Sequence, residues 1–120
     1  SGPVMRFHRL LLACVLLVPV AWADDVMDQE IDHLLDTVGS SNCVFVRNGK
    51  EHGPQAAKEH LSMKRRRGKK YFDSTEEFID NLASSSSWTG KPYVIQCGED
   101  GAQPAAEWFA NVLRKYRGRR

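Results

Sequence analysis

The sequence lacks the short motifs that would assign a reaction to it. No CxxC, HxxH or HExxH spacing occurs, so no common metal site is indicated. No GxSxG or SxxK occurs either, so the run Ser84 to Ser87 is interpreted as a source of helix-end and loop hydrogen bonds rather than of a nucleophile. We expect no cofactor, no metal and no catalytic residue. A divergent hydrolase or thiol enzyme is the alternative.

Apolar runs long enough to span a membrane are also missing. The run Leu10 to Val20 has eleven residues, too few to cross a bilayer of about 30 Å as a helix. It follows Arg6 and Arg9 and precedes Ala21-Trp22-Ala23, a small-x-small signal peptidase site. We interpret residues 1–23 as a cleaved signal peptide for export to the periplasm and expect no transmembrane span after cleavage. Residues 1–4, which precede Met5, are set apart as an N-terminal scar or a start-site ambiguity.

Cysteine is scarce, with three in the chain. Cys14 lies in the signal peptide, where Leu11-Leu12-Ala13-Cys14 resembles a lipobox, so a lipoprotein anchored at Cys14 is the alternative to a free exported domain. Cys43 and Cys97 remain, and an even pair in an oxidising compartment favours a disulfide. Free thiols, or a metal pair with His52 or His60, are the alternatives. A bridge would close a loop of about 54 residues and stabilise the fold by about 4 kcal/mol.

The exported chain has no net charge. Loss of Arg6 and Arg9 from the 17 basic residues leaves 15 against 15 acidic ones. The charges are segregated, since residues 24–36 hold six acids and no Lys or Arg, whereas residues 64–70 hold six Lys or Arg residues. We expect no nucleic-acid binding, because one stripe without interleaved aromatics is a weak footprint. The stripe is either a solvated helix end or a site for an anionic envelope surface or a partner protein. Its candidate binding residues are Lys64, Arg65, Arg66, Arg67, Lys69 and Lys70.

Hydrophobic periodicity and turn residues predict a short series of elements. Asn48-Gly49 indicates a tight hairpin, since both residues tolerate positive φ. Ser74, followed by Glu77, is a helix N-cap in capping-box spacing. The predicted helices are residues 26–38, a helix from Pro54 interrupted at Gly68, a third from Ser74 to Ala83, and 105–116; the predicted strands are 43–47, 50–52 and 93–97.

These elements predict one α+β domain over residues 24–116, in the order α-β-β-α-α-β-α, with a mobile basic tail at 117–120. We expect a two- or three-stranded antiparallel sheet packed against helices on one face. A Cys43–Cys97 bridge would place the first and last strands side by side.

The loop "SSSSWTGKP" and His60 hold the other candidate groups. Trp88, Lys91 and Tyr93 form either a lid over the core or an aromatic contact patch. Arg47 and Asn48 at the hairpin are candidates to share that surface. His60 falls on the buried face of its helix and is interpreted as a hydrogen-bonded core histidine.

Four blocks of sequence carry a family resemblance. "NCVFVRNG", "AAKEHLSMK", "TEEFIDNLASSSSWTGKPYVIQC" and "EWFANVLRKY" resemble the YfeK-like family of small exported bacterial proteins, a domain of unknown function. The resemblance covers about residues 42–116 and implies a periplasmic location and a paired Cys43 and Cys97. It supplies no reaction, ligand or site residue. This chain departs from the pattern in its denser basic run and in Trp88.

The sequence thus indicates a small periplasmic protein that is most simply a non-enzymatic binding or accessory domain of the cell envelope. A binder of anionic lipids or lipopolysaccharide through the basic stripe is a more specific hypothesis. The sequence does not identify the partner.

Overall fold

The computed structural model describes residues 20–119, with side chains described from Trp22 onward. Residues 1–19 of the predicted signal peptide, including Cys14, lie outside this part. The first described helix, α2, spans Val20–Gly39, so it begins six residues before the predicted start and runs through the expected cleavage point between Ala23 and Asp24. Its apolar residues recur at helical spacing, and Ile31, Leu34, Leu35 and Val38 form its buried stripe, with Met27 partly buried.

The predicted hairpin is present. Strand β1 (Cys43–Arg47) pairs with β2 (Lys50–His52) in antiparallel register. Asn48 and Gly49 connect the strands with φ values of 51° and 76°. Both residues therefore adopt the left-handed conformation that the Asn-Gly pair favours.

The sheet has four strands, in the order β2-β1-β3-β4, so the expectation of two or three strands was wrong. Strand β3 covers Val94–Cys97. The extra strand, β4 (Gln103–Pro104), lies in a segment predicted to be a loop and pairs with the first residues of β3. Two residues are too short for a periodic pattern, and proline is tolerated there because β4 is an edge strand.

A disulfide joins the two central strands. Cys43 and Cys97 are directly opposite each other in the β1–β3 pairing, with their Cα atoms 4.1 Å apart, and their sulfurs are bonded. The predicted bridge is confirmed. The alternatives in which these two cysteines are free thiols or metal ligands are wrong.

The remaining helices follow the sequence in outline. Helix α3 (Pro54–Arg67) ends at Gly68, and the 3₁₀ turn η1 (Lys69–Tyr71) follows. A Cβ at Gly68 would lie 2.8 Å from the Lys64 carbonyl and 3.0 Å from Leu82, so glycine allows this turn to pack closely. Helix α4 (Thr75–Phe78) continues into the π-helical η2 (Ile79–Ala83), and α5 spans Ala105–Gly118.

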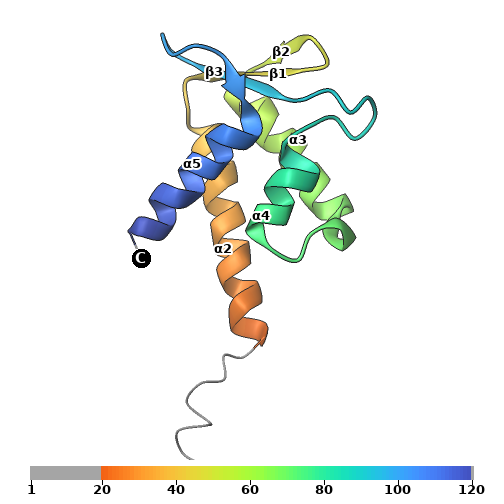
Figure 1. Cartoon of the computed structure of the whole chain (residues 1–120), viewed down its shortest axis with the longest axis vertical. Coiled ribbons are helices and arrows are strands. Elements are labelled where there is room, and N and C mark those ends of the chain that lie inside the picture. The colour runs from red at the N-terminus through yellow and green to blue at the C-terminus, as the bar shows by residue number, and fades with distance from the viewer. Residues whose placement is uncertain (1–19, 120) are drawn as a thin grey trace, which may run out of the picture.

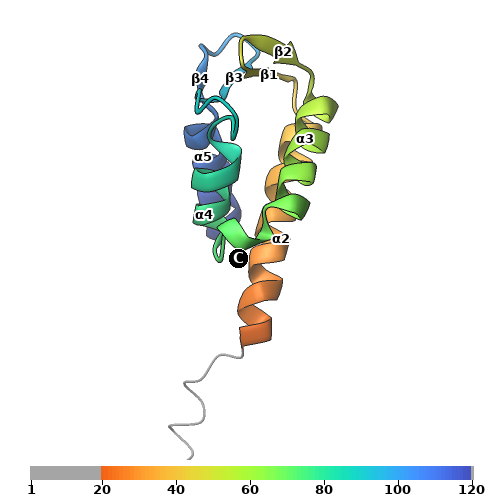
Figure 2. The same cartoon turned by 90° about the vertical axis from the view of Figure 1, so that its right-hand side faces the viewer.

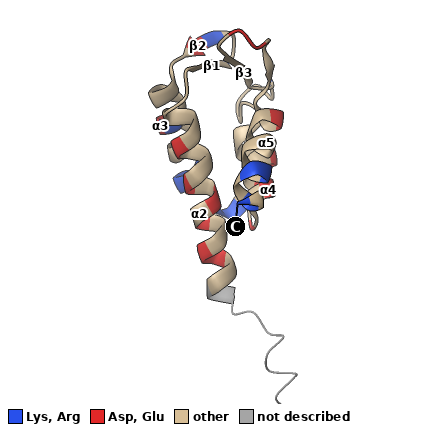
Figure 3. Ribbon diagram, turned by 90° about the vertical axis from the view of Figure 1, so that its left-hand side faces the viewer, with Lys and Arg blue, Asp and Glu red and all other residues tan. Residues whose placement is uncertain are grey.

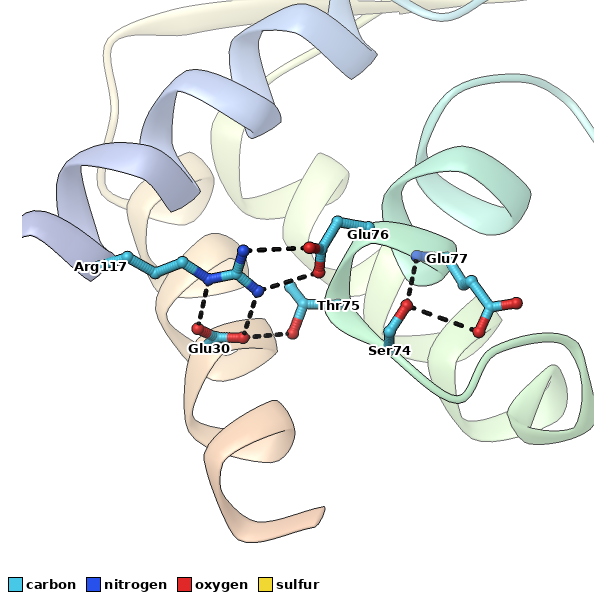
Figure 4. Close-up of polar contacts among 6 residues, drawn as sticks. All are labelled: Glu30, Ser74, Thr75, Glu76, Glu77 and Arg117. Carbon is cyan, nitrogen blue, oxygen red and sulfur yellow. Dashed lines mark hydrogen bonds and ion pairs between the residues drawn. The ribbon is translucent and has the colours of Figure 1, made fainter. Parts of the chain in front are cut away.

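The predicted cap of α4 is confirmed. The Ser74 hydroxyl accepts the Glu77 amide at 3.1 Å (Figure 4). In return, the Glu77 carboxylate accepts the Asp73 amide at 3.0 Å. The first turn of α4 therefore has side-chain partners for its backbone donors.

The helices lie on one side of the sheet. Figures 1 and 2 show the sheet at one end of the domain, with α2 beside α3. Helices α4 and α5 both contact α2, and η2, which continues α4, packs against α5. Apolar side chains from these helices meet under the strands and form a single core. Its largest fully buried members are Phe45, Phe78, Tyr93, Phe109, Ile31, Leu34, Leu61 and Ile95.

Candidate functional site

The predicted basic stripe is divided by the structure into three parts, and Lys64 is the first. Lys64 follows Ala57 and Leu61 on the core-facing side of α3, so only 8% of its surface is exposed. Its Nζ donates to the carbonyl of Ser85 and to the hydroxyl of Tyr93, each at 3.0 Å. Contrary to the sequence-based expectation, Lys64 does not belong to an exposed binding stripe.

The second part is Arg65, which binds the acidic helix α2. Its Nη1 lies 2.6 Å from the Asp32 carboxylate, and its Nη2 lies 3.3 Å from that of Asp28. Figure 3 shows the acidic positions along α2 in red, beside α3. The two carboxylates compensate the charge of Arg65, so we remove this residue too from the candidate anion-binding group.

The third part stays exposed, and we call it the basic turn: Arg66, Arg67, Lys69 and Lys70. Within residues 20–119, none of these four side chains forms an ion pair. Lys70 lies over the exposed ring of Tyr71, with its Nζ 5.1 Å from the ring centroid. These four cations are therefore available to an external anion.

The loop from Ser84 to Pro92 presents Trp88 to solvent. Trp88 is 97% exposed, so the interpretation of this residue as a lid over the core was wrong. The loop is nevertheless ordered by hydrogen bonds, because the buried Ser86 hydroxyl accepts the amides of Trp88 and Thr89 at 3.2 and 3.3 Å. Asn48 of the hairpin donates to Ser86 Oγ and accepts from Thr89 Oγ1 at 2.6 Å. The expected proximity of Asn48 to this loop is confirmed.

The other two candidates in this loop have different positions. Lys91 is exposed, whereas Tyr93 is only 1% exposed and packs its ring 5.0 Å from that of Phe45. Tyr93 therefore belongs to the core and not to an aromatic contact patch.

A hollow of about 210 Å³ connects the basic turn with the loop. Arg67 and Tyr71 line it on one side and Ser87 on the other, with Met63 and Leu82 among its apolar walls. The exposed Trp88 directly follows Ser87. Arg67, Tyr71 and the loop that carries Trp88 thus share one region of the surface, although the sequence separates them by about 20 residues. Arg66 and Lys69 line a different hollow, beside Asp28 and Arg65.

A second group of cations, which the sequence analysis did not assemble, lies where the hairpin meets α3. Alternation along β1 places Arg47 on the same face as the buried Phe45. The register pairs Phe45 with His52 and Arg47 with Lys50, so the hairpin directs three basic residues toward the helices. Helix α3 contributes His60 and Lys64 from below. We call this group the basic junction: Arg47, Lys50, His52, His60 and Lys64.

Hydrogen bonds connect members of the basic junction through Tyr93. The Tyr93 hydroxyl lies 3.2 Å from His60 Nε2 and 3.0 Å from Lys64 Nζ. Since the Lys64 ammonium donates to Tyr93, the Tyr93 hydroxyl is free to donate to His60. Arg47 Nη2 lies 3.5 Å from His52 Nε2. His60 is part-buried and bonded, in agreement with its interpretation as a hydrogen-bonded histidine.

Burial and mutual repulsion shift the pKa values of this group. Burial, followed by repulsion from Arg47, Lys64 and His52, lowers the pKa of His60 to about 4. Burial and Arg47 lower the pKa of Lys64 to about 8, and burial with Arg47 and Lys50 lowers the pKa of His52. Burial raises the pKa of Tyr93. All of the charges that act on the two histidines and Lys64 are positive. With a pKa of about 4, His60 is neutral at pH 7.

A different charged group has a structural role (Figure 4). The buried Glu30 carboxylate accepts from Arg117 Nε at 2.8 Å, from Arg117 Nη2 at 3.1 Å and from the Thr75 hydroxyl at 2.6 Å. Glu76 of α4 accepts from the same guanidinium at 2.9 and 3.0 Å. Arg117 therefore joins α2, α4 and α5, and it does not belong to a mobile basic tail, as the sequence analysis expected.

Among the described residues 20–119, no serine is hydrogen-bonded to a histidine, and no group of three metal-ligating side chains occurs. Ser84 donates to the Asp80 carbonyl at 2.6 Å, a helix-end hydrogen bond as expected. No helix in this part of the chain is long and apolar enough to cross a membrane.

The described residues form a small disulfide-bonded α+β domain. It has two groups of basic residues, the exposed basic turn and the partly buried basic junction. The chain belongs to DUF5329, a family of unknown function, which it matches over residues 25–117. It is 40% identical over 86 residues to the uncharacterized protein YfeK of Salmonella typhimurium, a match that covers 69% of this chain and 71% of that protein. No solved structure matches it. The resemblance found in the sequence blocks is confirmed.

Proposed function

We propose that this chain is an exported, non-enzymatic binding domain of the bacterial envelope that contacts an anionic lipid surface through the basic turn. The observation that carries this proposal is a hollow lined by Arg67 and Tyr71 of the basic turn region and by Ser87, which directly precedes the exposed Trp88. Basic residues are attracted to anionic headgroups, and tyrosine and tryptophan favour the membrane interface. This arrangement suits a surface contact without insertion of a helix.

Two further observations favour lipid over a solvated helix end. The acidic residues of α2 pair with Arg65 and Lys58, and so compensate other cations than those of the basic turn. The loop that carries Trp88 is held by hydrogen bonds before any partner binds, so little ordering cost remains at contact.

Vesicle binding tests the proposal. We expect the protein to bind phosphatidylglycerol-containing vesicles at low salt and to dissociate as salt rises, because exposed charges are screened over about 8 Å at physiological ionic strength. The double substitution Arg66→Ser and Arg67→Ser should weaken binding about 30-fold, since each basic residue near such a surface contributes about 1 kcal/mol. Cosedimentation with vesicles measures this difference.

The matched control removes the same charge elsewhere. Arg114→Ser with Lys115→Ser changes two exposed cations of α5, which lies across the domain from α3 (Figures 1 and 2). This variant should bind like the wild type. A wild-type protein that ignores phosphatidylglycerol vesicles at low salt, or a control that weakens binding equally, would refute the lipid contact. Vesicles of phosphatidylcholine alone should retain none of the three proteins.

Export is the second part of the proposal, and it rests on the basic start, the apolar run and the small-x-small site before Asp24. The disulfide favours it because such bonds persist in oxidising compartments. N-terminal sequencing of protein recovered from the periplasm should begin at Asp24. A lipid-modified Cys14 would instead mean an anchored lipoprotein and would contradict cleavage at this site.

A further inference from the structure

The basic junction is a charged group without a carboxylate among the contacts that the structure describes. Two other arginines of the domain have acidic partners: the partly buried Arg65 binds Asp28 and Asp32, and Arg117 binds Glu30 and Glu76. At the junction the hydrogen-bond partners are a hydroxyl, a carbonyl and an imidazole. The positive charges of the partly buried Arg47 and the buried Lys64 repel each other and disfavour protonation of the two histidines, and a bound anion would relieve both effects.

The two acidic residues nearest in sequence do not supply that anion. Glu51 lies between Lys50 and His52 on β2, and alternation along the strand directs it to the opposite face. Glu59 precedes His60 on α3 but is exposed, and it is not among the charges that shift the pKa of His60. The charged groups that do act there, from the hairpin and from α3, are Arg47, His52 and Lys64.

The junction lies where the hairpin meets α3, and Figure 2 shows the hairpin above the start of α3. Arg47, His52 and His60 are each only partly buried, so their polar atoms are within reach of a solute. Lys64 and Tyr93 lie deeper and are buried.

We propose that the basic junction binds a small oxyanion, a phosphate or sulfate group, through Arg47 with His52 and His60 as further donors. A guanidinium presents parallel N–H groups that match two oxygens of such an anion. Imidazolium nitrogens both donate, so a bound anion stabilises the protonated form of each histidine. The inference uses residues outside the basic turn and holds whether or not the protein contacts lipid.

Titration with inorganic phosphate, followed by NMR of the full chain, tests the site. We expect saturable changes at the Arg47 side chain and at the His52 and His60 rings, together with higher pKa values for both histidines. Glycerol 3-phosphate is the second probe: tighter binding than inorganic phosphate would identify the ligand as a phosphate ester, and equal or weaker binding would identify it as the free ion. Both probes should bind the same three residues.

Substitutions distinguish a specific phosphate-binding site from nonspecific electrostatic attraction of the anion. Arg47→Gln should weaken phosphate binding at least tenfold, and Arg47→Lys, which keeps the charge but not the paired donors, should weaken it less. Arg114→Gln removes the same charge from α5 and should bind like the wild type. Arg66→Ser with Arg67→Ser, which weakens the proposed lipid contact, should leave phosphate binding intact. Circular dichroism identifies any variant that fails to fold. If Arg47→Gln fails to fold, the phosphate affinity of Arg47→Lys is compared with that of the wild type instead.

The pH dependence gives an independent readout. Sulfate keeps its full charge from about pH 5 to about pH 9, so changes in its affinity report on the protein. Protonation of His52 and His60 should strengthen sulfate binding toward about pH 5, and loss of the Lys64 proton above about pH 8 should weaken it. Absence of saturable binding in the wild type, or equal affinity of Arg47→Gln and Arg114→Gln, would overturn the proposal.

Discussion

Replacement of both Cys43 and Cys97 by alanine should lower the free energy of unfolding by about 4 kcal/mol, because the bridge closes a loop of about 54 residues in the unfolded chain. The cross-link joins β1 to β3, the two central strands of a four-stranded sheet. For a domain of this size, whose total stability is of the order of 5–15 kcal/mol, this is a large fraction. Urea denaturation, monitored by circular dichroism, measures the difference.

A reducing agent supplies the internal control for this experiment. It should destabilise the wild-type protein by a similar amount and leave the double alanine variant unchanged, since that variant has no bridge to lose. Equal stability of the oxidised and reduced wild-type protein would show that the disulfide does not limit the freedom of the unfolded chain.

Local features of the fold could be predicted from the sequence because each depends on neighbouring residues. The Asn48-Gly49 turn requires two residues that tolerate positive φ, and the Ser74 cap requires only its own hydroxyl and the Glu77 amide. The buried stripes of α2 and α5 follow from a period of 3.6 residues. The family also could be recognised, because its blocks of sequence occur in a specific order.

Features that depend on contacts between distant segments could not be predicted in the same way. The short strand β4 exists because the start of β3 offers it a partner, and two residues hold no periodic signal of their own. Lys64 looks like one more member of a charged run. Its burial follows from Ser85 and Tyr93, which lie more than 20 residues away and accept its hydrogen bonds.

The candidate sites illustrate the same limit. Charge density along the chain suggested one stripe of six cations, whereas the structure leaves four of them exposed and brings other cations together at the basic junction. One signal for the junction was present in the sequence. Alternation from Phe45 already places Arg47 on the inner face of the hairpin, opposite Lys50, but only the packing of the hairpin over α3 brings His60 to it.

Arg117 gives the second large effect that we expect. Replacement of Arg117 by methionine keeps an apolar stem but removes the guanidinium that holds Glu30 and Glu76. The Glu30 side chain is only 4% exposed, so its carboxylate would keep the Thr75 hydroxyl but lose the cation that compensates its charge. Removal of one partner from a buried ion pair destabilises a protein by about 3–5 kcal/mol. Because Arg117 is partly exposed, we expect a loss at the lower end of this range, about 3 kcal/mol.

Controls on the same helix make this expectation specific. Arg114→Met removes an equal charge three residues earlier, where the guanidinium bonds only to Asn111 among its described contacts, and it should change stability by no more than about 0.5 kcal/mol. Glu30→Gln combined with Arg117→Met should recover part of the loss, since the buried negative charge of Glu30 is then absent. The Glu76–Arg117 pair also makes the effect depend on pH. The hydrogen bond from Arg117 lowers the pKa of Glu76 in the folded protein. The pair therefore stabilises the fold above the unfolded pKa of about 4.5, and this stabilisation is lost as the pH falls through the lower folded pKa. The difference between wild type and Arg117→Met, measured by urea denaturation, should therefore narrow below about pH 4.5. Equal effects of Arg117→Met and Arg114→Met at neutral pH would contradict a structural role for the Glu30–Arg117 pair.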